Sequence, residues 1–350
     1  MKTSLTSLAL ASGSYLALAL GGCADAPEDA SARFALALES VQTLSFDVPG
    51  EDEGDLALAD LALIEAPLLG GPSTLRALTG VVRQHLRKTV AVVSEMLARV
   101  ANKAPTFTTT NGAVWMDRRE GHRALVMRDR GNHFEFSVWQ RFRAGEDWSF
   151  NAGGTVIDDA DGGVRGAVWL DLDQDDSPRS HGKLMLLWSE LAGARRIDVN
   201  LYDGTPNDNE IAAVTRNYRY ADGPEGGVLA FDAGEVDVHL LPSRDGLEQV
   251  RVYTRWNDRG AVRSDYGAVG DDVSADGFRL LLGSECWVPP DASITYESRV
   301  GLPADGGAPV RLYETGDRAT CGFAAEEPPV IAPAGRAPSE PALPSELEGR

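Results

Sequence analysis

The chain is poor in positive charge. Its 350 residues include 33 lysines and arginines against 53 aspartates and glutamates, which gives a formal net charge of -20. Nucleic acids and anionic lipid headgroups are bound through clustered basic side chains. The composition therefore argues against a nucleic-acid partner, and against a membrane contact made by protein charge.

Recognisable catalytic signatures are also lacking. The sequence contains no Gly-x-Ser-x-Gly nucleophile turn, no phosphate-binding glycine loop and no dinucleotide fingerprint. Ser284 lies in the stretch Gly283-Ser284-Glu285-Cys286, but no base is recognisable beside it. The five histidines are far apart and show no zinc-ligand spacing: His85, His122, His133, His181 and His239. These absences favour a non-enzymatic role.

The first 23 residues carry a recognisable targeting pattern, and no motif in the rest of the chain is as clear. After Lys2, an apolar run of leucines and alanines continues to Leu20 and is interrupted by Ser12-Gly13-Ser14. Because a membrane span needs about 20 consecutive apolar residues, this run predicts a secretory signal peptide over 1–22.

The end of that run, Leu20-Gly21-Gly22-Cys23, resembles the lipobox of bacterial lipoproteins, and the resemblance covers only the leader. It implies cleavage before Cys23 by the type II (lipoprotein) signal peptidase, acyl chains on Cys23, and a stable lipid anchor in the cell envelope. Ala24 stands where lipoproteins retained at the inner membrane often carry aspartate, so the outer membrane is favoured. The implied partner is therefore the membrane, through the N-terminal lipid.

Cysteine is scarce, with three residues in all. If Cys23 carries lipid, Cys286 and Cys321 remain as a pair in an oxidising compartment, and we predict a disulfide between them. A reactive thiol or a metal pair is the alternative, but no histidine follows His239.

The two ends of the mature chain differ from its middle. Residues 23–71 are acidic and predict a tether that contains short local elements, at Phe34 to Leu44 and Leu56 to Ile64. Residues 324–350 contain six prolines and few large apolar residues, which favours an extended disordered tail.

Residues 72–104 predict one long amphipathic helix. Ser73 can cap its start, and Pro105 follows its end. An apolar stripe recurs at three- and four-residue steps, with arginines such as Arg76 and Arg83 on the other surface. The stripe suits a core helix packed on a sheet; a helix lying on a membrane or forming a movable lid is the alternative. The stripe consists of Leu75, Leu78, Val82, Leu86, Val90, Val93, Leu97 and Val100.

After residue 105 the hydrophobic period changes to two. His133 to Arg141, Arg195 to Tyr202 and Gln249 to Trp256 alternate apolar and polar side chains, which predicts strands with one polar face. Turn signals recur between such runs. For 105–323 we therefore expect about a dozen antiparallel strands, with the long helix packed on a large curved sheet, sandwich or partly open barrel. The turn signals are Arg130-Gly131-Asn132, Asp161-Gly162-Gly163, Asp222-Gly223-Pro224, Asp232-Ala233-Gly234, Asp245-Gly246 and Asp258-Arg259-Gly260.

A weak metal site is conceivable within this domain. Asp171, Asp173 and Asp175 alternate and could offer carboxylates to calcium, in a pattern that resembles the start of an EF-hand loop. The match fails at Asp176, where the loop needs glycine, and at Gly182, where it needs glutamate. A solvated turn is the simpler interpretation. If calcium binds, millimolar calcium should raise the melting temperature.

Three functions remain open. The leading one is a lipid-anchored envelope protein with a non-enzymatic structural or binding role. The second is a carrier of apolar ligands with a helix lid, which requires a continuous apolar cavity beneath the helix. The third is a carbohydrate-binding or carbohydrate-active protein, which requires tryptophans and two carboxylates in one exposed cleft. We expect most of the seven tryptophans to be buried in strands instead.

Overall fold

The computed structural model describes residues 27–42, isolated positions between 44 and 91, most residues from 103 to 330, and residues 339–348. Within 103–330, the segments 118–122, 159–162, 172–181, 203–213, 237–247 and 289–292, with residues 142 and 144, lie outside this description. The predicted signal peptide, the lipobox with Cys23, and the second predicted tether element lie outside it as well.

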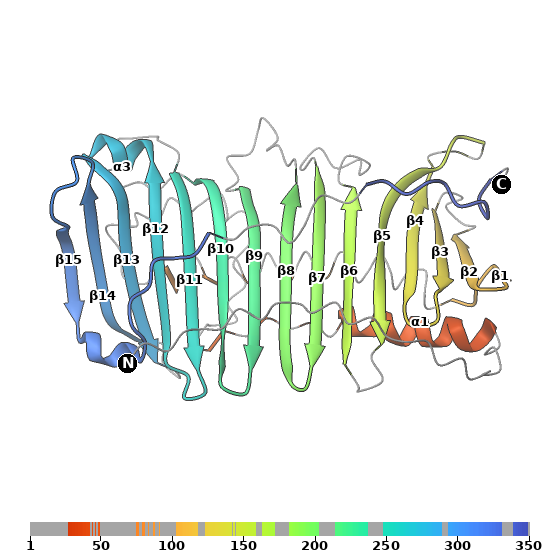
Figure 1. The fold of residues 1–350 in the computed structure, drawn as a ribbon, viewed down its shortest axis with the longest axis horizontal. Coiled ribbons are helices and arrows are strands. Elements are labelled where there is room, and N and C mark those ends of the chain that lie inside the picture. Colours follow the sequence, from red (N-terminus) through yellow and green to blue (C-terminus); the bar gives the residue numbers. More distant parts are fainter. Residues whose placement is uncertain are drawn as a thin grey trace, which may run out of the picture.

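Fifteen strands of the described chain form one antiparallel sheet in simple sequence order, from β1 to β15 (Figure 1). Adjacent strands lie about 4.8 Å apart, so the sheet spans roughly 65 Å from edge to edge. The sheet is not closed. The strands are β1 (Phe107–Thr109), β2 (Gly112–Asp117), β3 (Arg123–Asp129), β4 (Phe134–Gln140), β5 (Ser149–Asp158), β6 (Val164–Asp171), β7 (Lys183–Leu191), β8 (Ala194–Tyr202), β9 (Val214–Gly223), β10 (Gly226–Val236), β11 (Glu248–Asn257), β12 (Val262–Gly270), β13 (Phe278–Val288), β14 (Ser293–Pro303) and β15 (Val310–Gly316).

The antiparallel, strand-rich architecture confirms the sequence prediction. Of the three forms left open, which were a large sheet, a sandwich and a partly open barrel, the described chain forms one large sheet. Each connection between consecutive strands joins neighbours in a single open sheet. The three strands predicted from alternation correspond to β4, β8 and β11. One predicted turn is wrong: Asp232-Ala233-Gly234 lies inside β10, where the pairing register with β9 shifts between Asp232 and Ala233. A β-bulge accommodates the extra residue without ending the strand.

Successive side chains of a strand point to opposite faces of the sheet. We call face A the face that carries Trp115, Phe136, Tyr220 and Trp287, which belong to the larger apolar core. Face B is the opposite face. It carries a smaller core formed by Val114, Ala124, Val126, Trp139, Phe150, Trp169 and Leu347, and the disulfide cluster of Cys286, Tyr296 and Cys321.

Helix α1 (Pro27–Gln42) covers face A near β1 to β5 (Figure 1). Its Phe34 is fully buried and contacts three aromatic rings of the sheet, at centroid distances of 5.6 to 5.9 Å. Arg33 forms an ion pair with Asp129 at 2.7 Å. This part of the acidic 23–71 segment therefore packs on the sheet, because its apolar side chains recur at helical spacing.

The predicted long helix over 72–104 is not present as a continuous element in the described chain, where α1, with 16 residues, is the longest helix. Seven described positions there are helical: 75, 76, 79, 80, 83, 87 and 91. Arg83 was expected on the outer surface, yet it is 8% exposed, and Thr79 is fully buried. Thr79 can be buried because its hydroxyl donates to the Leu75 carbonyl at 2.8 Å and lies 3.1 Å from the Thr254 hydroxyl on face A.

Two short elements complete the description: helix α3 (Asp271–Ala275) between β12 and β13, and the 3₁₀ helix η3 (Arg318–Cys321) after β15. No helix in the described part of the chain combines the length and hydrophobicity that crossing a membrane requires.

Candidate functional site

Beyond η3 the chain turns back over face B, and its described parts lie across β13 to β10 and then across β5 and β4 (Figure 1). We call residues 321–330 and 339–348 the C-terminal segment. The sequence favoured a disordered tail here, but Pro328, Pro344 and Leu347 are buried. Leu347 is 1% exposed and belongs to the face B core.

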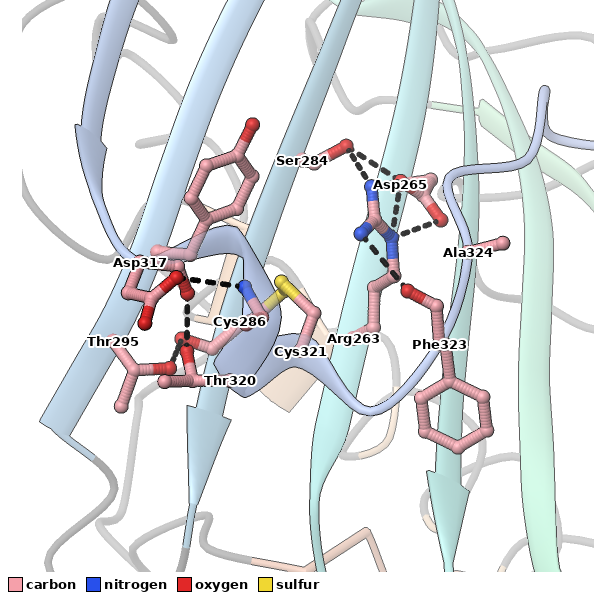
Figure 2. The surroundings of a disulfide bond; sticks show 12 residues. Arg263, Asp265, Ser284, Cys286, Thr295, Asp317, Thr320, Cys321, Phe323 and Ala324 are labelled. Carbon is pink, nitrogen blue, oxygen red and sulfur yellow. Dashed lines mark hydrogen bonds and ion pairs between the residues drawn. A yellow bond between two sulfur atoms is a disulfide. The ribbon is translucent and has the colours of Figure 1, made fainter.

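The predicted disulfide is present. Cys286 on β13 and Cys321 at the end of η3 are bonded, with an S–S distance of 2.06 Å, and both are fully buried (Figure 2). Asp317 caps η3 by accepting a hydrogen bond from the backbone N–H of Ala319. The disulfide attaches the start of the C-terminal segment to β13, two strands from the β15 edge of the sheet.

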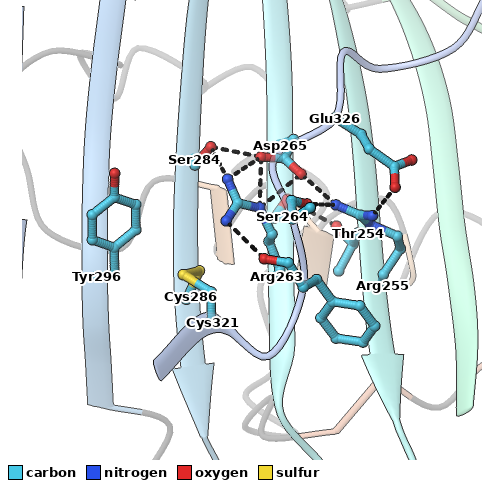
Figure 3. A network of polar contacts seen from close by, with 12 residues as sticks. Thr254, Arg255, Arg263, Ser264, Asp265, Ser284, Cys286, Tyr296, Cys321 and Glu326 are labelled. Carbon is cyan, nitrogen blue, oxygen red and sulfur yellow. Dashed lines mark hydrogen bonds and ion pairs between the residues drawn. A yellow bond between two sulfur atoms is a disulfide. The ribbon is translucent and has the colours of Figure 1, made fainter. Parts of the chain in front are cut away.

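A buried polar network lies beside the disulfide (Figure 3). Arg263, 1% exposed, donates to both carboxylate oxygens of Asp265 and to the Ser284 hydroxyl, which in turn donates to Asp265 at 2.6 Å. Arg255 joins the same carboxylate to Glu326 of the C-terminal segment, at 2.7 and 2.6 Å. The network positions the C-terminal segment through Glu326. The Ser284 hydroxyl is held by Arg263 and Asp265, and the network contains no histidine that could act as its general base.

A second buried polar cluster lies on face A. The Glu285 carboxylate accepts hydrogen bonds from the backbone N–H groups of Leu75 and Arg76. Burial raises the pKa of Glu285 to about 7, opposed by those two N–H donors. Tyr266 on β12 is fully buried nearby, and burial raises its pKa well above the ordinary value. The cluster holds Leu75 and Arg76 against the sheet.

A pocket of about 310 Å³ lies farther along face B, between the sheet and residues 339–344. Strand register builds its floor from two rows that cross β3 to β6. The first row is Val126, Ser137, Gly153 and Trp169; the second is Arg128, Glu135, Thr155 and Ala167. Ser339, Pro341, Ala342 and Pro344 form the opposite wall.

Aromatic rings form one side of this pocket. Phe150 and Trp169 stack with their centroids 4.2 Å apart, and Trp139 meets Phe150 edge-on at 5.4 Å. The indole N–H of Trp139 donates to the Ser137 hydroxyl at 2.9 Å, which fixes that hydroxyl in place. The aromatic side is therefore rigid before any ligand arrives.

Charged groups form the rim. Glu135 pairs with Arg130 at 2.8 Å, and this hydrogen bond and charge hold the pKa of Glu135 below its ordinary value despite some burial. Arg128 pairs with Glu346 of the C-terminal segment at 2.9 Å. Burial tends to raise the pKa of Glu346, but the hydrogen bonds, chiefly that from Arg128, outweigh it and the net shift is downward. Glu135 is thus a charged acceptor at neutral pH.

The structure brings few of the predicted site residues together. Asp171 is 9% exposed at the end of β6, while Asp173 and Asp175 lie outside the described residues, so calcium binding stays a prediction. Across the described chain, no group of three or more metal-ligating side chains is assembled. Six tryptophans are at most 9% exposed, as expected: Trp115, Trp139, Trp169, Trp188, Trp256 and Trp287.

Sequence reasoning missed the pocket, although its signal was partly present. Glu135 and Ser137 were assigned to the polar face of their strand, which is the pocket side. Their neighbours Thr155 and Ala167 come from strands whose register the sequence did not specify. The wall from the proline-rich segment had been interpreted as disordered.

Comparison of the chain with protein-family models, with curated proteins and with solved structures gives no match.

Proposed function

We propose that the protein is a non-enzymatic lipoprotein of the bacterial cell envelope, anchored by lipid on Cys23, that binds a short carbohydrate in the pocket on face B. The single observation that supports the binding role most is the pocket itself, with about 310 Å³ between a rigid aromatic side and a polar rim. That volume is at the lower end for ligand pockets and suits one or two sugar rings.

The described lining contains one tryptophan and one carboxylate, so it does not meet the condition stated above for a carbohydrate-active site, but it offers the groups that bind a sugar. A sugar ring presents C–H groups to apolar or aromatic surfaces and hydroxyl groups around its edge. Here the apolar contact falls to the edge of Trp169, which is 9% exposed and is backed by the buried Phe150. The hydroxyl groups would meet Ser137, Thr155 and the charged acceptor Glu135. The pocket would therefore recognise a sugar by packing against the aromatic side and by a small number of hydrogen bonds from the rim.

Binding is favoured over hydrolysis. Glycoside hydrolysis uses two carboxyl groups that flank the bond, one of them an acid with a raised pKa. Among the described residues that line the pocket, Glu135 is the single carboxylate, and its pKa is lowered. This arrangement supports a hydrogen-bond acceptor and gives no support to a general acid.

The apolar-carrier alternative has less support. It needs a cavity under the 72–104 segment, but the described positions there touch the sheet directly, through Thr79 to Thr254 and through the backbone of Leu75 to Glu285. These polar contacts favour an element packed on face A over a lid.

The binding proposal is tested by calorimetric titration of the purified mature chain against a panel of neutral and N-acetylated di- and trisaccharides. Ala167→Leu places a larger side chain in the second floor row, so we expect the affinity for any bound sugar to fall more than tenfold with an unchanged near-ultraviolet circular dichroism spectrum. Ala304→Leu, in an exposed turn, is the matched control and should bind normally. Absence of binding across the panel, or equal affinity in the Ala167→Leu variant, would contradict the proposal.

The anchoring proposal has its own test. Mass spectrometry of the mature N-terminus from a bacterial host should find Cys23 as the first residue, carrying acyl chains. Cys23→Ser should release the protein from the membrane fraction. An unmodified start at another residue would overturn the anchor and leave the binding site unaffected.

A further inference from the structure

The last strand of the sheet, β15, is exposed along its whole length. All seven residues of Val310–Gly316 are exposed. The described chain exposes six large apolar side chains, and three of them are in this strand: Val310, Leu312 and Tyr313, at 40 to 43%. In the described part of the chain, no strand pairs with the outer edge of β15.

The two edges of the sheet differ in length. Strand β1 has three residues, and Pro105 lies just before it. Short edge strands and prolines are the usual means by which proteins prevent edge pairing. Strand β15 has seven residues and no proline, so it offers backbone donors and acceptors beside apolar side chains on both sides of the bulge at Leu312.

We propose that β15 is a self-association surface, which pairs antiparallel with β15 of a second copy of this chain to make one continuous sheet. A two-fold axis between Leu312 and Tyr313 places these two residues opposite each other's equivalents. The same register places Arg311 opposite Glu314 of the second copy, twice, by symmetry.

Charge complementarity favours a second copy of the chain as the partner and antiparallel pairing of the two β15 strands. The pairing register of β14 and β15 shifts between Arg299 and Val300, opposite Leu312, so Arg311 and Glu314 share a face and form an ion pair within the strand. The Tyr296 hydroxyl also donates to Glu314, at 3.0 Å. In the antiparallel pair, two arginines and two glutamates form one cluster. In-register parallel pairing would instead place like charges side by side.

Analytical ultracentrifugation of the purified mature chain tests the proposal. Because a single edge strand buries little area, we expect a reversible dimer in the micromolar range. Arg311→Glu or Glu314→Arg puts like charges opposite each other and should weaken the dimer about tenfold. The double variant, Arg311→Glu with Glu314→Arg, again places opposite charges across the interface and should dimerise as the wild type does.

Leu191→Asp is the matched control, because Leu191 is 53% exposed on another part of the molecule. Circular dichroism checks that each variant folds. A monomer at all concentrations up to about 200 µM, a double variant as weak as the single ones, or equal weakening by Leu191→Asp would overturn the proposal.

Discussion

At the residue scale, Glu285 is the most informative titratable group. Its carboxylate is buried on face A, where Glu297 and Arg299 of β14 and Tyr266 of β12 surround it and two backbone N–H groups from residues 75 and 76 donate to it. Burial raises its pKa to about 7 from an ordinary value of 4.5.

Because folding raises the pKa of Glu285, the folded protein should lose stability as the pH rises. The stabilisation from a protonated Glu285 is complete below about pH 4.5 and is lost as the pH rises through 7, by roughly 3 kcal/mol in all. Glu285→Gln keeps the site neutral, so urea unfolding between pH 5 and 8 should show a flatter pH dependence than the wild type. Glu190→Gln, on an exposed strand end, serves as the control. The same pH dependence in wild type and Glu285→Gln would contradict this assignment.

Residue patterns predicted burial well where one face of a strand was apolar, as in β4. They failed at Arg83, which was expected on the outer surface and is 8% exposed. The neighbouring Thr79 shows what the sequence does not display: its hydroxyl is buried against Thr254 of β11, 175 residues away.

At the element scale, the C-terminal segment is the element that composition described least well. Six prolines and few apolar residues favoured disorder, yet one leucine, one disulfide and a few ion pairs place the described residues on face B. Such a segment needs no core of its own, because the sheet supplies the apolar surface.

The disulfide should account for much of this attachment. It closes a loop with a sequence separation of 35, which on the chain-entropy model stabilises the folded state by about 4 kcal/mol. The Cys286→Ala/Cys321→Ala variant should therefore unfold at a markedly lower urea concentration, measured by tryptophan fluorescence. An unchanged midpoint would show that the bond contributes little to stability.

At the scale of the whole molecule, strand content and antiparallel pairing followed from alternation and turn signals, but the choice between one large sheet, a sandwich and a partly open barrel did not. A meander of this kind and a sandwich share the same local patterns. They differ in which faces are covered. Here face A is covered by α1 and by later residues such as Phe46 and Leu75, and face B is covered by the C-terminal segment.

The central claim is that the C-terminal segment and the sheet together form a binding pocket. It is tested most directly by comparing sugar affinity in two variants of that segment, Leu347→Asp and Leu343→Asp. Leu347 is buried in the face B core, whereas Leu343 is 37% exposed. The account predicts that Leu347→Asp lowers the affinity at least tenfold and that Leu343→Asp preserves it, because a buried charge displaces the pocket wall. Wild-type affinity in the Leu347→Asp variant would contradict it.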